Sequence, residues 1–495
     1  MDQPPAPRPR DSYALAGSLF LRALAVVYLM AFVSLAVQIR GLAGANGILP
    51  AAQYLEALGA QVGPERYWHV PTLFWLTGAS DGVLVAACWA GAAVALMVAC
   101  GFLPLPGLIA CFALYLSLSS GTRTFLNFQW DILLTEAGLL ALFVAPWRLR
   151  APVPSLPAPA APALWLVRWL LFRLMFSSGV VKLTSGDPTW WNLRALDVHY
   201  FTQPIPTWTA WFVHQLPAWF HTFECGVMFC IELVVPFGLF APRPVRRVCA
   251  LILFGFQAMI AATGNYAFFN YLTMALCLVL FDDAAWPAWL RRRLPATDSA
   301  VPARRWPLWV SIPVLTVFVT LTTAAMTSRW DMPLGWPSPV EKALTLVRPL
   351  RIINAYGLFA VMTTTRQEIV VEGSDDGQNW SAYEFKWKPG DVSRRPGFVA
   401  PHQPRLDWQM WFAALSSYRQ QPWFANFLGR LLQGSPEVLA LLEKNPFPDR
   451  PPRYIRSVVY DYRFSDFGVR RESGAWWVRT PEGQYSPVQS LRRAP

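Results

Sequence analysis

Six ionisable side chains fall inside strongly apolar stretches of the sequence, where charges are rare. They are Asp131, Glu136, Arg173, Lys182, Glu224 and Glu232. Charged groups within membrane-spanning segments are costly, so they usually face a protein interior or a water-filled cavity, where they pair or carry a function. Two interpretations follow. One is mutual pairing, for example of Arg173 with Glu136 or Glu232, and the other is a chemical site within the membrane.

Lys182 offers the most specific chemistry of the six. A partly desolvated lysine has a lowered pKa and can serve as a general base. Lys182 also lies where an apolar run ends, so its ammonium group could reach water along the flexible stem without doing any chemistry. The sequence names Lys182 as the candidate catalytic residue and leaves pairing, contact with water and catalysis open.

Residues 176–208 form an unusually aromatic stretch that begins in the apolar run containing Lys182. A connecting segment this long and this aromatic is rarely a mere linker. Trp and Tyr gather where hydrocarbon gives way to water, because each ring has an apolar body and a polar edge. The pattern predicts that a membrane surface is marked by Trp190, Trp191, Tyr200, Trp208 and Trp211.

Three histidines, His199, His214 and His221, lie in or beside this aromatic stretch. Their spacing does not match a metal pair on a helix, and no Cys or acid completes a ligand set. The sequence also lacks a Gly-rich phosphate loop, a Gly-x-Ser-x-Gly elbow and a Cys/His nucleophile pair. It therefore predicts interface histidines, no metal and no cofactor.

The composition indicates a membrane protein that positions these residues on helices. Apolar residues make up 54% of the 495 residues and charged residues only 15%, whereas soluble domains are roughly 25% charged. Runs near 20 apolar residues recur, which is typical of polytopic membrane proteins. They predict about nine spans, at residues 15–39, 82–103, 105–119, 131–147, 164–182, 219–240, 248–263, 268–281 and 308–326.

The net charge of +12 comes largely from arginines beside these runs. Basic residues next to spans orient them toward the cytoplasm, so we expect no nucleic-acid partner. If residues 1–14 are a cytoplasmic tail, every basic cluster falls on the cytoplasmic side. The clusters are Arg8 with Arg10, Arg148 with Arg150, Arg243 with Arg246 and Arg247, and the arginines among residues 291–305.

This pattern predicts a transmembrane helical domain at residues 15–326 and a non-cytoplasmic soluble domain at residues 327–495. Alternating apolar residues at 458–464 are typical of a half-buried strand, and further strands are predicted near 369–371, 380–387 and 475–479. Helices are predicted at 408–418 and 423–431, and a third begins with Ser435 as its cap and ends before Pro446. The expected fold of this domain is α+β.

Residues 402–411 of this domain mix a turn with a helix start, and five of them are candidates for binding a partner: His402, Arg405, Asp407, Trp408 and Trp411. Arg and Trp dominate binding hot spots, so an exposed cluster would bind a client or dock on the aromatic stretch. In the alternative interpretation, Arg405 and Asp407 pair with each other and only fix the turn.

Several motifs occur in order along nearly the whole chain. They are NFQWD at 127–131, YFTQPIPT at 200–207, GNY at 264–266 with FFN at 268–270, KPGD at 388–391, PHQPRLDWQMWF at 401–412, NPF at 445–447 and YDYRF at 460–464. Together they resemble the lipase maturation factor family. The resemblance implies a membrane-bound assembly factor, without an established active site, that helps secreted lipases fold and dimerise.

The same resemblance implies the partners and the location. The expected partners are a secreted lipase-like client and membrane lipid. The expected location is the endoplasmic reticulum membrane in a eukaryote or the inner membrane in a bacterium, with the C-terminal domain on the non-cytoplasmic side.

A second and much shorter pattern supports the alternative function. Gly179 to Leu183, with Lys182 inside and Trp190 following, is similar to the horizontally transferred transmembrane domain of vitamin K-dependent carboxylases. A lysine at the matching position acts there as a base. This similarity implies a membrane-embedded enzyme acting on a lipid or quinone at a cavity around Lys182.

Overall fold

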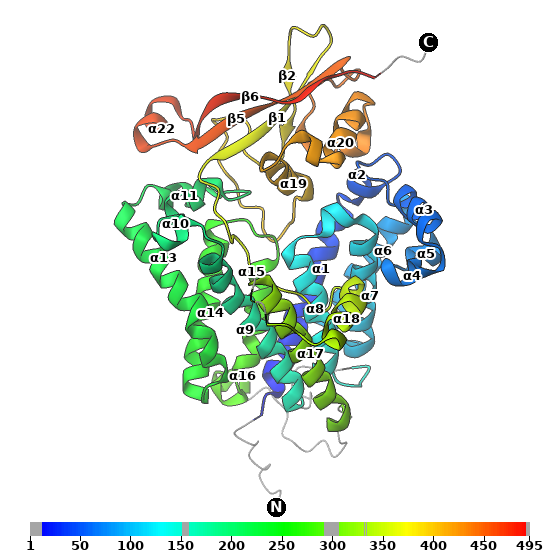
Figure 1. Ribbon diagram of the computed structural model, residues 1–495, viewed down its shortest axis with the longest axis vertical. Coiled ribbons are helices and arrows are strands. Elements are labelled where there is room, and N and C mark those ends of the chain that lie inside the picture. The colour runs from blue at the N-terminus through cyan, green and yellow to red at the C-terminus, as the bar shows by residue number, and fades with distance from the viewer. Residues whose placement is uncertain (1–11, 151–157, 292–305, 331, 333, 492–495) are drawn as a thin grey trace, which may run out of the picture.

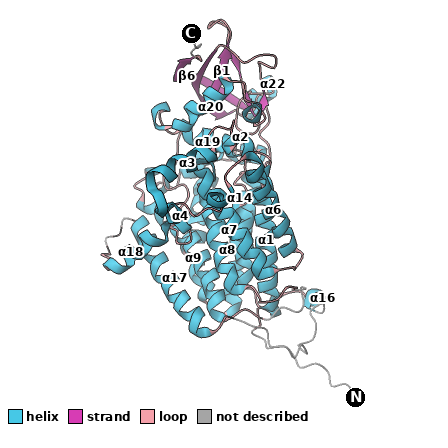
Figure 2. Ribbon diagram, turned by 90° about the vertical axis from the view of Figure 1, so that its right-hand side faces the viewer, coloured by secondary structure: helices cyan, strands magenta, loops and turns pink. Residues whose placement is uncertain are grey.

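The chain forms a bundle of helices capped at one end by a β-sheet (Figure 1). The computed structural model describes residues 12–150, 158–291, 306–330, 332 and 334–491. The N-terminal end lies at the foot of the bundle, and the C-terminal end lies beside the sheet at the opposite end (Figures 1 and 2). This places the two ends of the described chain on opposite sides of the bundle.

Seven helices of the described residues are long and apolar enough to cross a membrane. They are α1 (Ala14–Ala36), α6 (Asp81–Ala99), α7 (Pro104–Thr122), α9 (Ala161–Thr184), α13 (Ala218–Leu233), α14 (Arg243–Thr263) and α17 (Leu308–Arg329). Short 3-10 turns extend α7 through Arg123–Leu126 and α13 through Val235–Phe240. The polytopic helical fold predicted from the sequence is confirmed.

The predicted count of about nine spans is not confirmed. The two remaining predicted spans correspond to α8 (Gln129–Val144) and to α15 (Phe269–Cys277), which a 3-10 turn continues through Leu278–Leu280. At 1.5 Å per residue, the 16 residues of α8 are shorter than a hydrocarbon core about 30 Å thick. Both helices are packed within the bundle, and α8 contacts α1, α7 and α9.

Shorter helices connect the long ones. Those nearest the sheet are α2 (Ile39–Ala43), α10 (Pro188–Trp191), α11 (Ala195–Thr202) and α12 (Trp208–His214), whereas α3 (Ala51–Val62), α4 (Arg66–His69) and α5 (Phe74–Thr77) lie along one side of the bundle (Figure 1). At the foot lies α16 (Ala288–Arg291), and α18 (Ser338–Val347) follows α17 on the side of the bundle (Figure 2). The aromatic stretch is thus mostly helical.

Helices α1 and α8 approach closely because a glycine lies at their contact. A Cβ atom added to Gly138 would lie 1.9 Å from the Tyr28 hydroxyl oxygen. That hydroxyl donates to the carbonyl of Leu134 at 3.1 Å. Small residues at helix contacts let backbones come together where burial of apolar surface no longer drives association. The interior of the bundle therefore has no spare volume at this point.

The region after the bundle is α+β, as predicted. Its main sheet is antiparallel in the order β2 (Ser381–Ala382), β1 (Arg366–Ser374), β5 (Tyr454–Phe464) and β6 (Trp477–Gln489). A second pair joins β3 (Glu384–Phe385) to β4 (Leu442–Lys444). The helices are α19 (Arg405–Ala414), α20 (Pro422–Leu432), α21 (Pro436–Leu439) and α22 (Phe467–Ser473). The helix predicted from Ser435 is only four residues long.

Helices α19 and α20 lie between the sheet and the bundle (Figure 1). The apolar face of α20 is buried, with Trp423, Phe427 and Leu431 repeating every four residues. The Trp423 ring contacts Phe125 at the sheet end of α7 edge to face, with centroids 5.9 Å apart. These contacts bring residues 402–411 against the bundle rather than onto the outer surface.

Candidate functional site

Arg405 and Asp131 form a buried ion pair between the C-terminal region and the bundle. The two terminal guanidinium nitrogens of Arg405 donate to the two carboxylate oxygens of Asp131 at 2.9 and 3.0 Å. The Tyr115 hydroxyl also donates to Asp131. Neither ion is exposed. A planar bidentate pair is the strongest form of this interaction, and it fixes orientation as well as distance.

The exposed binding surface expected around this arginine is absent from the structure. Arg405, Asp407 and Trp408 are all buried. The Asp407 carboxylate accepts the N–H groups of Trp387 and Lys388 at 2.8 and 2.9 Å, so the expected Arg405–Asp407 pair is wrong. Burial raises the pKa of Asp407, while these two N–H bonds oppose the change. Client binding by these side chains would require an exposure that they lack here.

Trp411 and His402 extend the same contact. The Trp411 indole donates to the carbonyl of Thr202 in the aromatic stretch at 2.9 Å, which agrees with the expectation that this helix docks there. His402 contacts the Ser34 hydroxyl through Nδ1 at 3.0 Å. Burial, together with the nearby cations Arg405 and Lys386, lowers the pKa of His402 to about 4. The five predicted partner-binding residues therefore lie at an internal junction.

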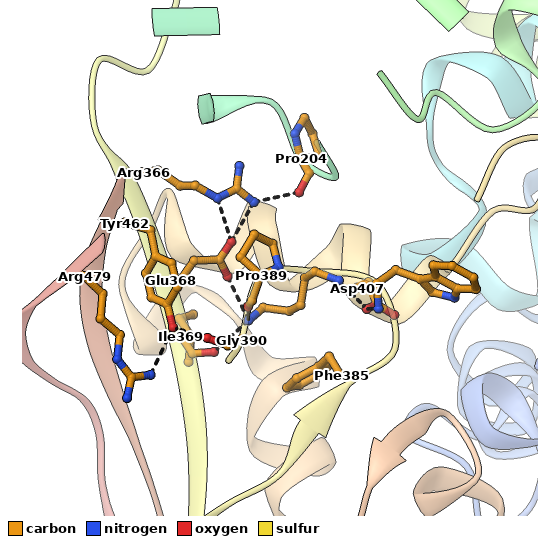
Figure 3. A network of polar contacts seen from close by, with 12 residues as sticks. Pro204, Arg366, Glu368, Ile369, Phe385, Pro389, Gly390, Asp407, Tyr462 and Arg479 are labelled. Atoms are coloured by element: carbon orange, nitrogen blue, oxygen red, sulfur yellow. Dashed lines mark hydrogen bonds and ion pairs between the residues drawn. The ribbon is translucent and has the colours of Figure 1, made fainter. Parts of the chain in front are cut away.

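A second buried network ties strand β1 to the aromatic stretch (Figure 3). Arg366 donates to the carbonyls of Phe201 and Pro204 at 2.8 Å each and also to that of Gln203. Its charge is balanced by Glu368, 2.6 Å away. The other carboxylate oxygen of Glu368 binds the Lys388 ammonium at 2.8 Å. One carboxylate thus holds two cations in a buried position.

Neutral amides complete the junction. Asn265 accepts the N–H of Val399 at 2.8 Å and donates to the carbonyl of Gly397 at 2.8 Å. Gln38 donates to the carbonyl of Gln403 at 2.7 Å and accepts the N–H of Arg405 at 3.0 Å. Each amide therefore bonds the backbone of the C-terminal region in both directions, so its orientation is fixed.

Glu136 and Arg173 confirm the pairing interpretation for two of the six intramembrane charges. Their side chains form a buried ion pair between α8 and α9. The second oxygen of Glu136 accepts the Tyr356 hydroxyl at 2.7 Å and the Asn354 amide at 2.8 Å. Residues 354–356 lead from the bundle to the sheet, so this cluster also fastens the connection.

Lys182 pairs with Glu232. Its ammonium group donates to both Glu232 oxygens, at 2.9 and 2.7 Å, and to the carbonyl of Ser178 at 3.1 Å. Both side chains are buried, so of the three alternatives for Lys182 the one in which it reaches out to water is wrong. Glu224 differs, because it accepts hydrogen bonds from Tyr200 at 3.1 Å and from His221 at 3.3 Å.

A cavity of about 320 Å³ lies beside this pair. Helices α9, α11, α13 and α14 form its walls, and most of the lining is apolar. The lining includes both the Lys182–Glu232 pair and the Tyr200–Glu224 pair, and the two glutamates lie two turns apart on α13. The lining also includes His199, whose pKa is lowered to about 4 by burial and by the charge of Lys182.

Most of the aromatic side chains predicted to mark a membrane surface are buried in the protein. Trp190, Tyr200 and Trp211 are buried, and of the predicted surface markers only Trp191 is largely exposed. The Trp211 ring contacts Trp476 and Phe467 edge to face, with centroids 5.5 and 5.0 Å away. Four predicted markers are therefore partly or fully covered by the protein.

Sequence reasoning did not select four polar residues that hold the junction: Arg366, Glu368, Asn265 and Gln38. Arg366 and Glu368 lie just before the predicted strand at 369–371, and the observed strand β1 begins at Arg366. Residues two apart on a strand lie on one face, so an acid and a base at this spacing are a weak signal of pairing. Gln38 at the end of an apolar run carries no signal of its own.

Sequence models of one family match both parts of the chain. A lipase maturation factor transmembrane domain matches residues 15–288, and a lipase maturation factor C-terminal domain matches residues 352–487. No solved structure matches the chain.

Named relatives match over nearly the full length. Lipase maturation factor 2 of Gallus gallus is 38% identical and covers 99% of this chain and 82% of its own. Lipase maturation factor 2 of Homo sapiens is 35% identical over 96% of this chain and 83% of its own. Lipase maturation factor 1 of Mus musculus is 34% identical over 98% of this chain and 89% of its own.

Proposed function

Because this chain belongs to the lipase maturation factor family, we propose that it assists the folding and dimerisation of secreted lipases or similar clients from within the membrane. The observation that carries this proposal is the match to both family domains in order, over nearly the whole chain. The relatives' names supply the client class, a lipase.

The geometry at Lys182 favours this function over the membrane enzyme. A catalytic base needs a free lone pair near the substrate. All three N–H donors of the Lys182 ammonium are engaged by Glu232 and Ser178. We therefore propose that Lys182 holds α9 against α13 and that the other intramembrane charges likewise hold helices and the C-terminal region in place.

We propose the following domain organisation: a cytoplasmic tail at residues 1–14, a transmembrane domain at 15–326 and a non-cytoplasmic domain at 327–495. Seven crossings and nine crossings are both odd numbers, so either count supports opposite sides for the two ends. Near the N-terminal end of the described chain, Arg246 donates to the Tyr13 hydroxyl and Arg247 to the Asp282 carboxylate. Basic residues at this end support its cytoplasmic location.

We propose the junction as the feature that presents the C-terminal domain to a client. Its buried ion pairs fix the sheet over the bundle, so the domain stands at a set height above the membrane. In this interpretation His402, Arg405, Asp407, Trp408 and Trp411 support client handling indirectly, and client contacts fall on the outer surfaces of the domain. Membrane lipid surrounds the bundle as the second partner.

The test is the yield of active secreted lipase in cells that lack a maturation factor of their own and express this chain. We expect lipase activity per secreted lipase molecule to rise when the full chain is present. A matched chain carrying Asp131→Asn and Arg405→Gln, expressed at the same membrane level, should restore less activity. Equal specific activity with and without the full chain would overturn the proposed function.

A further inference from the structure

The cavity beside Lys182 opens sideways between two helices that are long enough to cross a membrane. Three residues that line it on α13 and α14 are also exposed: Phe223 (61%), Val227 (39%) and Met259 (48%). Both helices are candidate spans. In a bilayer this opening therefore borders hydrocarbon, and whatever enters comes from the lipid phase.

The polar groups of the cavity wall are already satisfied by the protein. The Lys182 ammonium is bonded to Glu232, and the Tyr200 hydroxyl to Glu224. The Tyr266 hydroxyl donates to Gln203 at 3.1 Å. Gln257 accepts from Asn270 at 2.9 Å.

Four more polar lining groups have partners. His199 contacts the Tyr266 hydroxyl through Nε2 at 3.4 Å. The indole of Trp190 donates to the carbonyl of Phe359 at 3.1 Å, and the Thr263 and Ser178 hydroxyls donate to carbonyls of their own helices. A polar ligand would gain few new hydrogen bonds here. The apolar wall formed by residues such as Met175, Ile231 and Phe256 is what remains for a guest.

We propose that this cavity binds the hydrocarbon chain of a membrane lipid. Its volume of about 320 Å³ is at the lower end of the range for small-molecule sites, roughly 300–1,000 Å³. The chain arrives from lipid and not from water, so the fit of its shape to the apolar wall decides how tightly it binds. The bound chain fills the space between α9, α13 and α14 and needs no chemistry at Lys182.

The experiment uses the full chain purified in detergent and a 16-carbon fatty acid carrying a photoreactive diazirine in mid-chain. After illumination, mass spectrometry locates the labelled residues. We expect saturable labelling of α13 and α14 at the lining positions, which excess unlabelled fatty acid or a single-chain phospholipid suppresses. Suppression by only one of the two competitors identifies the head group that accompanies the chain.

Two matched substitutions on α14 test whether the hydrocarbon chain binds inside the cavity. Ile260 lines the cavity, whereas Ile252, two turns earlier on the same helix, is exposed outside it. Ile260→Trp places a larger ring in the cavity and should lower specific labelling roughly tenfold, a change in affinity that corresponds to about 1.4 kcal/mol. Ile252→Trp should leave labelling unchanged. Val227→Trp, at the mouth, provides a second blocking variant if Ile260→Trp does not fold.

Three outcomes would overturn the proposal. The first is labelling that does not saturate in the unaltered chain, and the second is labelling spread evenly over the exposed faces of α13 and α14. The third is equal labelling of the Ile260→Trp and Ile252→Trp variants. Each of them indicates only the ordinary contact of lipid with the outside of a membrane protein.

Discussion

Arg405 and Asp131 are 274 residues apart in the chain, yet the two terminal guanidinium nitrogens of Arg405 donate to the two carboxylate oxygens of Asp131. Neither side chain is exposed. The aspartate belongs to a helix of the bundle and the arginine to the C-terminal region. The pair joins the regions that match the two family domains. Because Arg405 faces the bundle, the helix that carries it is buried against the bundle and not exposed as a binding surface.

Arg405→Ala should destabilise the whole protein. Removing one partner of a buried ion pair costs about 3–5 kcal/mol, because the other charge stays buried without compensation. The measurement is thermal unfolding of the purified chain, with Arg419→Ala, an exposed arginine of the same domain, as the control. Asp131→Asn combined with Arg405→Gln should cost less than the sum of the two single changes. Equal stability of Arg405→Ala and Arg419→Ala would contradict the role of the pair.

Lys182→Arg should be tolerated, because arginine keeps a cation opposite Glu232, whereas Lys182→Ala should reduce the amount of folded protein. The yield of active secreted lipase is measured together with the membrane level of each variant. Arginine does not deprotonate in proteins, so it cannot replace a catalytic base. Complete loss of lipase yield with Lys182→Arg at a normal membrane level would point back to chemistry at this lysine.

The C-terminal junction should weaken in acid because of His402. Its pKa is about 4 in the folded protein and about 6.5 in an unfolded chain. The unfolded state therefore binds the extra proton, and stability falls as the pH drops from about 6.5 toward 4.

His199 and His214, whose pKa values burial also lowers to about 4, add to this decline. His402→Gln should remove roughly 1–3 kcal/mol of the loss, while His69→Gln, at an exposed position, should leave the pH profile unchanged. Unfolding midpoints measured between pH 4 and 7 test this, and identical profiles for the two variants would be the contrary result.

Gly138→Ala should destabilise the contact of α1 with α8, because the new methyl group would collide with the Tyr28 hydroxyl. Overpacking of this kind typically costs about 1–3 kcal/mol. Gly226→Ala is the matched control, since nothing lies within 4 Å of a Cβ atom there. The comparison is of unfolding temperature in one detergent, and an equal effect of both changes would mean that the helices can move apart freely.

A reporter that works only in the cytoplasm should be inactive when fused after Pro495 and active when fused after Arg150 or Arg293. The reason is the proposed orientation, in which the arginine clusters place the foot of the bundle on the cytoplasmic side. Strong activity of the Pro495 fusion would place the sheet in the cytoplasm.

The sequence predicted the helices and strands better than it predicted which charged side chains pair. Of the nine apolar runs, seven correspond to described helices that are long enough to cross a membrane, and the alternation around Tyr460 identified β5. Both signals are local properties of the sequence. Arg173 and Glu136 were candidates for pairing because few charges enter the membrane. Asp131, by contrast, could not be matched to Arg405, since no local pattern links residues so far apart.

The alternative prediction, in which Arg405 pairs with Asp407, is wrong for a geometric reason. Arg405 and Asp407 lie two residues apart on α19, and side chains at that spacing on a helix do not face each other. Tryptophan next to arginine is typical of binding surfaces, but the same composition suits a contact within one chain. Exposure separates the two cases, and only the folded structure supplies it.

The distance in sequence between Asp131 and Arg405 also imposes an order on synthesis. At about 5 to 20 residues per second, the 274 residues between them take roughly 14 to 55 s to make. During that time the carboxylate has no arginine, but the Tyr115 hydroxyl and the Phe128 N–H are already made and can bind it. In a newly made bundle, Asp131 is therefore bonded only to neutral groups until Arg405, in the last third of the polypeptide, has been synthesised.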